Sequence, residues 1–112
     1  MTAEDTLQIA ASNFLRLQYP KALFFHTPNG GSRNKIEGAK LKRMGILKGV
    51  ADCLILEARN GFIGLAIELK IKPNQPTPEQ LEFLSQLNAR KWKTEVIYNL
   101  DIFIETVDKY LK

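Results

Sequence analysis

Two apolar runs joined by a tight turn lie at the centre of this 112-residue chain, and they constrain its fold more than any other feature. The runs cover residues 51–58 and 62–71, and the turn between them contains Asn60-Gly61. An Asn-Gly pair between two apolar runs is a strong signal for an antiparallel β-hairpin. The residues from Phe62 to Ile67 are all apolar or glycine, so the second run is expected to form a central strand.

Each run also carries an acid. Asp52 lies near the start of the first run, and Glu68-Leu69-Lys70 ends the second. Alternate side chains of a strand share a face, so Glu68 and Lys70 are expected to project together, roughly 6.5 Å apart along the strand. An unpaired acid inside a protein costs several kcal/mol, and either Lys70 or a metal ion could compensate for it. Two carboxylates that hold a hard cation, beside a lysine that holds an anion, suit cleavage of a phosphodiester. A simple Glu68–Lys70 pair would need no such chemistry, and the pattern alone does not separate the two interpretations.

The turn decides whether Asp52 and Glu68 can share an ion. With a two-residue loop, a regular ladder pairs Asp52 with Leu69 and places the two acids on opposite faces of the sheet. With a three-residue loop formed by Arg59-Asn60-Gly61, Asp52 faces Glu68. A shared metal ion therefore predicts the three-residue loop, or a compensating bulge in one strand.

The rest of the chain predicts helices around this hairpin. A first helix is expected from about Ala3 to Gln18, capped by Thr2, with Leu17 in its apolar stripe; a short buried strand is expected over residues 22–26. A basic helix is expected from about Arg33 to Met44. Another helix is expected to begin with Thr77-Pro78-Glu79-Gln80, and its Leu81, Leu84 and Leu87 are expected to face inward. A strand over residues 94–98 and a final helix, capped by Asn99 and with Ile102 in its apolar stripe, complete the chain. The order α-β-(α)-β-β-α-β-α predicts one α/β domain over residues 1–112, a sheet flanked by helices.

Composition excludes several classes of protein. With one cysteine and one histidine, the chain has neither an intramolecular disulfide nor a conventional zinc site. No apolar run reaches the ~20 residues that a membrane-spanning helix needs. The first five residues include two acids, where a secretory signal would be basic. We therefore expect a cytoplasmic protein with no membrane partner.

Basic residues are concentrated in one segment. The net charge is +4, and between residues 33 and 48 a single acid accompanies six basic residues, which are Arg33, Lys35, Lys40, Lys42, Arg43 and Lys48. Such a helix suits sequence-independent binding to a DNA backbone, and a solvated surface helix is the alternative. The preceding loop contains Asn29, Gly30 and Gly31, whose backbone N–H groups could approach phosphates, although such turns are common.

Asp52 followed by Glu68-x-Lys70 on the next strand resembles the PD-(D/E)xK signature of the restriction-endonuclease-like superfamily. Further motifs resemble one branch, the VRR-NUC domains, and particularly their stand-alone phage-type members. These motifs are His26-x-Pro28-Asn29-Gly30-Gly31-x-Arg33, Gly45 followed by Gly49-Val50-Ala51-Asp52, Pro78-x-Gln80, and Glu4-x-x-Leu7-Gln8. The resemblance extends from Glu4 to about Leu111. Ala51 stands where the signature usually has proline, a residue that shapes the backbone rather than the chemistry.

The resemblance implies a restriction-endonuclease-like αβββαβ core with a mixed central sheet, and a Mg²⁺-dependent endonuclease for which Mn²⁺ substitutes. It implies that Asp52, Glu68 and the main-chain carbonyl of Leu69 hold the metal, with Glu4 reaching it through water. Lys70 would orient the attacking hydroxide or hold a phosphate oxygen, and Gln80 corresponds to the family's active-site glutamine. The alternative interpretations are a solvated first-turn acid for Glu4 and a capping-box residue for Gln80. His26 is expected to be a packed or hydrogen-bonded residue at a strand end rather than a general base.

For partners, the resemblance implies branched DNA, such as four-way junctions or flaps, and a homodimer. A phage-encoded member would act in the host cytoplasm. RNA is an alternative substrate, because phosphodiester chemistry does not distinguish the sugars. A non-catalytic nucleic-acid-binding module on the same fold is the alternative function.

Overall fold

The computed structural model describes residues 1–28 and 35–112. Its elements, in chain order, are α1 (Ala3–Gln18), β1 (Phe24–His26), α2 (Lys35–Arg43), β2 (Cys53–Ile55), β3 (Gly64–Leu69), α3 (Pro78–Asn88), β4 (Trp92–Ile97) and α4 (Leu100–Leu111). This is the order that the sequence predicts.

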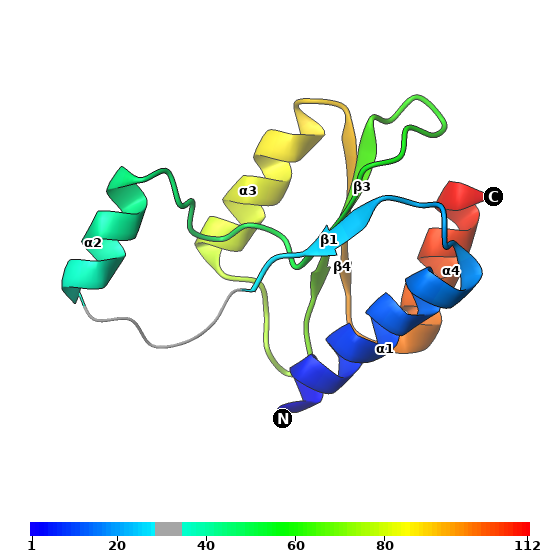
Figure 1. The fold of residues 1–112 in the computed structure, drawn as a ribbon, viewed down its shortest axis with the longest axis horizontal. Coiled ribbons are helices and arrows are strands. Elements are labelled where there is room, and N and C mark those ends of the chain that lie inside the picture. Colours follow the sequence, from blue (N-terminus) through cyan, green and yellow to red (C-terminus); the bar gives the residue numbers. More distant parts are fainter. Residues whose placement is uncertain (29–34) are drawn as a thin grey trace.

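The four strands form one mixed sheet in the order β1-β2-β3-β4 (Figure 1). Strand β2 is antiparallel to both β1 and β3, and β4 runs parallel to β3 after the crossover through α3. All six residues of β3 are buried, which confirms that the second apolar run forms a central strand. The mixed α/β class predicted from the sequence is therefore correct.

Helices cover both faces of the sheet (Figure 1). Helices α1 and α4 pack on one face, against alternate β3 residues Leu65, Ile67 and Leu69. Helix α3 packs on the other face through Leu84, near Ala66 of β3. Because side chains alternate along a strand, Glu68 belongs to the face that α3 covers.

The predicted caps begin the helices at the expected residues. Thr2 and Asp5 form a capping box at the start of α1, and Thr77 and Gln80 form one at the start of α3, where Pro78 is the first helical residue. The Asn99 side chain caps α4. These local hydrogen bonds satisfy the free N–H groups of each first turn and so fix the boundaries.

Several predictions of burial are wrong. The first strand is an exposed edge strand rather than a buried one, because it pairs only with β2, and Phe25 is 48% exposed. Three leucine or isoleucine residues expected in apolar stripes are also exposed: Leu17, Leu81 and Ile102. Leu15, Phe103 and Tyr110 occupy the core instead, because the helices are rotated slightly from the faces that their periodicity suggested.

The hairpin turn is shorter than the three-residue loop that was one of the two predicted arrangements. Arg59 and Phe62 form a paired bridge, and Asn60 and Gly61 between them both have positive φ, of 54° and 86°. This is a two-residue loop of the type I′ kind, for which Asn-Gly is well suited. Of the two arrangements that the sequence predicts for a shared ion, the three-residue loop is not formed, and the compensating bulge remains.

A bulge restores the register that the site requires. Below the loop, Ile55 pairs with Leu65 and Cys53 pairs with Ile67. Between these pairs and the Arg59–Phe62 bridge, residues 56–58 of the first strand oppose only residues 63–64 of the second. The extra residue shifts the ladder by one position, so the register carries Asp52 opposite Glu68.

Two neighbouring segments frame this region. Helix α2 stands apart from the sheet (Figure 1), and the chain returns from it to β2 through Gly45 and Gly49, with φ of +105° and +87°. A Cβ atom on Gly49 would lie 2.6 Å from the carbonyl carbon and oxygen of Glu79, whereas one on Gly45 would meet open space. Gly49 therefore allows the chain to pass directly against the first turn of α3. Among the helices of the described residues, none is long and apolar enough to cross a membrane.

The two glycines provide a matched comparison. We expect Gly45→Ala to lower the free energy of unfolding by about 1 kcal/mol, the cost of a positive φ. Gly49→Ala should cost about 2–4 kcal/mol, because strain and a clash with rigid backbone combine. Urea unfolding of both variants measures the difference. Equal losses would contradict the close approach of Gly49 to α3.

Candidate active site

Three charged side chains gather where β2 begins and β3 ends. Asp52 precedes β2, Glu68 lies near the end of β3, and Lys70 directly follows that strand. Their exposed fractions are 5%, 1% and 9%, respectively, so all three are buried. Burying charge is expensive unless the charges compensate one another or a bound ion does so. The structure therefore brings the predicted acid–acid–lysine set into one buried site.

Asp52 is held by hydrogen bonds at both its backbone and its side chain. Its Oδ2 accepts a hydrogen bond from the Leu69 backbone N–H at 2.8 Å. Its main-chain oxygen accepts from His26 Nδ1 at 2.8 Å and from the Thr27 N–H at 2.9 Å. His26 is thus a hydrogen-bonded residue at a strand end, as predicted. These contacts join β1, β2 and β3 at the carboxylate.

Glu68 is held from the opposite side. Gln80 Nε2 donates to Glu68 Oε1 at 3.0 Å, while Gln80 Oε1 accepts from the Thr77 backbone N–H at 2.8 Å. Gln80 therefore completes the capping box of α3 and also contacts the acid, so the two interpretations of this residue are compatible. The position of Glu68 is fixed by a helix start that local sequence determines.

The two acids affect each other electrostatically. Burial raises the pKa of Glu68 to about 9, with further contributions from a hydrogen bond to Asp52 and from the Asp52 charge, while Lys70 acts in the lowering direction. Glu68 Oε2 is buried and has no hydrogen-bond partner among the described residues. An acceptor in that position, beside a second carboxylate, requires a proton or a cation. Without metal, burial and the neighbouring Asp52 favour the protonated form of Glu68.

A cavity of about 240 Å³ opens beside Asp52. It is lined by Glu4, Asp5, Gln8, His26, Pro28, Asp52 and Leu69. Within residues 1–28 and 35–112, no three acidic, histidine or cysteine side chains are grouped so that they alone could hold a metal ion. The available donors are thus a carboxylate pair, nearby main-chain oxygens and water. That oxygen-only set suits Mg²⁺, which keeps several of its waters, and the unsatisfied Glu68 oxygen fits the same ion.

Glu4 reaches this site from the first turn of α1. Its pKa is raised, first by burial and then by the charge of Asp52, while Lys70 acts in the lowering direction. A freely solvated acid would not respond to these groups. Glu4 therefore lies close enough to Asp52 and Lys70 for their charges to affect its pKa.

Lys70 acts on the acids without a direct ion pair. The ion pairs among the described residues join Arg59 with Glu57, Lys93 with Glu95, and Lys112 with Asp108. Lys70 is in none of them, although its charge lowers the pKa of both Glu68 and Glu4. The simple Glu68–Lys70 pair considered from the sequence is not formed.

The predicted nucleic-acid-binding residues are only partly described. Lys40, Lys42 and Arg43 are exposed on α2, and Lys48 is exposed in the segment that follows. Lys35 is the first residue of α2. Asn29, Gly30, Gly31 and Arg33 lie outside the described residues. Helix α2, which carries three of these exposed cations, lies apart from the sheet (Figure 1).

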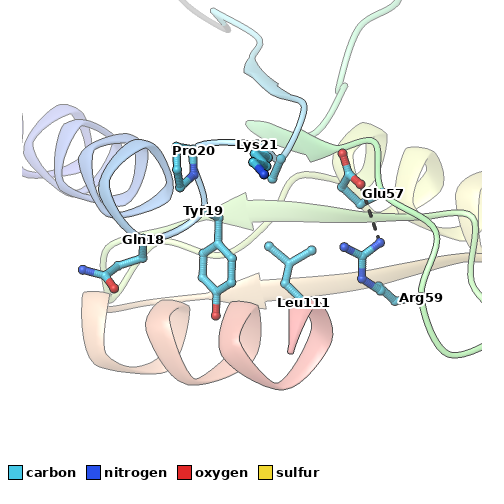
Figure 2. Close-up of a pocket in the computed structure, with 8 residues that line it drawn as sticks. Gln18, Tyr19, Pro20, Lys21, Glu57, Arg59 and Leu111 are labelled. Carbon is cyan, nitrogen blue, oxygen red and sulfur yellow. Dashed lines mark ion pairs between the residues drawn. The ribbon is translucent and has the colours of Figure 1, made fainter.

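Another hollow, of about 300 Å³, lies near the last turn of α1, lined by residues that include Tyr19, Lys21 and Leu111 (Figure 2). Glu57 forms an ion pair with Arg59 at 3.5 Å there and accepts a hydrogen bond from the Leu23 N–H. None of the predicted site residues lines it. Glu4 lies at the other end of α1, roughly 20 Å away at 1.5 Å per helical residue.

Sequence reasoning gave no role to two residues beside the site. Gln8 lines the cavity, and Gly49 packs against the first turn of α3 that carries Gln80. The spacing of Gln8 from Glu4, one helical turn, was the available signal for the first. For Gly49, a close approach of two backbones produces no sequence pattern other than the glycine itself.

No protein-family model matches the sequence, and no curated protein matches it. A solved structure described as a "VRR_NUC domain protein" is 29% identical, with a TM-score of 0.83, over 99% of this chain and 89% of that one. A second solved structure, described as a "VRR_NUC domain", is 18% identical, with a TM-score of 0.63, over 98% of this chain and 99% of that one. At this identity the second structure shows only that the fold is similar. The resemblance to VRR-NUC domains is therefore confirmed by the first of these structures.

Glu68→Gln tests the electrostatics of the site. The pKa of Glu68 is about 9 in the folded chain, against an ordinary value of 4.5. A raised pKa means that folding favours the protonated acid, so this group's contribution to stability is full below about pH 4.5 and is lost as the pH rises towards 9. The variant should remove that loss and, in EDTA at pH 8, raise the free energy of unfolding by about 1 kcal/mol or more.

Urea unfolding between pH 5 and 9 measures this effect. Glu105→Gln, at an exposed position of α4, is the matched control and should follow the wild-type profile. A Glu68→Gln protein less stable than wild type at pH 8 would show that the charge is well compensated without metal.

Proposed function

Since this chain has the VRR-NUC fold of a nuclease-type domain, we propose that it is a Mg²⁺-dependent endonuclease that hydrolyses phosphodiester bonds in branched DNA. One observation carries the proposal: two buried carboxyl groups, Asp52 and Glu68, meet beside a cavity and a buried lysine. Such a pair contributes little to the stability of the fold, because the two negative charges repel each other. A divalent cation would convert the repulsion into attraction.

In this proposal, each residue of the candidate site has a separate role. Asp52, Glu68 and the main-chain carbonyl of Leu69 would hold Mg²⁺ or Mn²⁺, with Glu4 acting through water. Bound there, the ion would lower the pKa of a coordinated water and neutralise charge on the scissile phosphate. Gln80 holds Glu68 in position through its hydrogen bond. Lys70 would orient the attacking water or bind a non-bridging phosphate oxygen, which its freedom from direct ion pairs supports.

DNA binding is assigned to the exposed cations of α2 and the following segment. These contacts with the phosphate backbone carry no sequence information, and a chain of this size has little further surface for reading bases. Recognition by shape is therefore favoured, which suits four-way junctions or flaps. A homodimer would present two such sites to the two strands of a symmetric junction.

Asp52→Asn and Lys70→Ala separate catalysis from binding. Each should lower the rate of Mg²⁺-stimulated cleavage at least 100-fold, because each removes a charge that the ion or the phosphate needs during the reaction. Binding to a labelled four-way junction should stay within about threefold, since neither residue is on α2. Cleavage gels and fluorescence anisotropy measure the two effects. Asp101→Asn and Lys109→Ala, both exposed on α4, are the matched controls.

The substrate panel should include duplex, flap, junction and single-stranded DNA, together with the RNA equivalents, each with Mg²⁺ and with EDTA. If the wild type binds a junction but cleaves none of these substrates in Mg²⁺, the protein is a non-catalytic binding module on the same fold.

The salt dependence of binding tests the role of α2. Alanine at Lys42 or Arg43 should weaken junction binding and reduce the slope of log K against log salt by about one for each phosphate that the variant no longer neutralises. Lys109→Ala, on the distant α4, should leave the slope unchanged. Equal slopes for all three variants and the wild type would make α2 a solvated surface helix with no part in binding.

A further inference from the structure

Gln8 carries a buried oxygen with no hydrogen-bond partner among the described residues. This atom is Oε1, whereas Nε2 of the same amide donates to Ser12 Oγ at 3.0 Å, one turn further along α1. In the structure the amide is oriented with Nε2 towards the Ser12 hydroxyl, which accepts this hydrogen bond. Leaving a buried acceptor unsatisfied is destabilising, so native proteins usually supply a donor from a bound molecule when the chain itself does not.

The side chain belongs to the cavity of the candidate active site. Gln8 lines the same 240 Å³ space as Glu4, Asp52 and Leu69. Glu4 and Gln8 are four residues apart, so they project from the same side of α1. The burial of Leu7 and Ala11 fixes the rotation of the helix that presents them.

The chemistry of the missing partner follows from the atom. An amide oxygen only accepts hydrogen bonds, and the oxygens of a DNA phosphate also only accept them, so the DNA backbone does not satisfy Gln8. Hydrated Mg²⁺ offers donors, because the ion retains several waters whose hydrogens point outwards. The cavity that Gln8 lines also contains Asp52 and Glu4, two of the acids that would hold such an ion.

We propose that Gln8 Oε1 accepts a hydrogen bond from a water in the hydration shell of the divalent ion held at this site, and so positions that water. This inference rests on the proposed function and adds a positioning residue to it. Ser12 serves the same purpose indirectly, since its contact with Nε2 leaves the oxygen as the end that is available to accept.

The test compares Gln8→Met, which has similar length and no amide oxygen, with Gln8→Glu, which keeps an acceptor. We expect Gln8→Met to weaken Mn²⁺ binding about tenfold by isothermal titration calorimetry, a typical effect of removing a group that supports a metal site from outside its ligand set. It should lower kcat for cleavage with little change in KM for DNA. Gln8→Glu should recover most of both losses. Gln18→Met, at an exposed position of the same helix, is the matched control.

Stability separates this role from a merely structural one. In EDTA, Gln8→Met should be as stable as the wild type or more so, because it removes an unsatisfied polar atom. If Gln8 had a structural role instead, the substitution would lower the melting temperature. If Gln8→Met does not fold, Ser12→Ala replaces it, and its freer amide should weaken Mn²⁺ binding several-fold.

The outcomes are distinguishable. Normal Mn²⁺ affinity in Gln8→Met, or in Ser12→Ala where that variant replaces it, overturns this proposal alone and leaves an ordinary buried water as the partner of Gln8. A wild type that binds no Mn²⁺ overturns the proposed function and this proposal together.

Discussion

The meeting of two carboxyl groups, from the start of β2 and the end of β3, dominates the electrostatics of the candidate site. Asp52 and Glu68 share a buried site, and the repulsion between them adds to the effect of burial, which contributes most to raising the pKa of Glu68 to about 9. The chain retains this unfavourable arrangement and places beside it the buried Lys70, whose charge acts to lower the pKa of Glu68. Local destabilisation of this kind is typical of sites that bind a ligand of opposite charge.

Several independent parts of the fold keep the pair in place. The Leu69 N–H holds Asp52 from β3, and Gln80 holds Glu68 from α3. Gly49 allows the segment that leads to Asp52 to pass against the same turn of α3 that carries Gln80. The two acids are therefore connected through the helix start as well as through the sheet.

Much of this arrangement could be predicted from the sequence, because local signals determine it. The capping residues Thr2, Thr77 and Asn99 each begin a helix, and Asn60-Gly61 forms the hairpin turn. The grouping of Asp52, Glu68 and Lys70 was predicted correctly, and their roles remain predictions.

The features that could not be predicted from the sequence depend on tertiary packing. The register agrees with the second of the two predicted arrangements, a two-residue loop with a compensating bulge. The position of the bulge could not be predicted, because residues 56–58 carry no distinctive signal. Leu17, Leu81 and Ile102 lie at the margins of apolar stripes, so a small rotation of each helix exposes them. Gln8 appeared only as part of the Glu4-x-x-Leu7-Gln8 motif, for which the resemblance implied a role for Glu4 and none for Gln8.

The bulge has a consequence for how such a chain tolerates change. Because the extra residue lies between the turn and the carboxylates, the geometry of the hairpin turn is independent of the geometry of the candidate site. Substitutions along residues 56–58 leave the residue count intact and so preserve the pairing below. Loss of one residue there would give a continuous ladder and turn Asp52 to the opposite face, so over evolutionary time this segment should accept replacements far more readily than deletions.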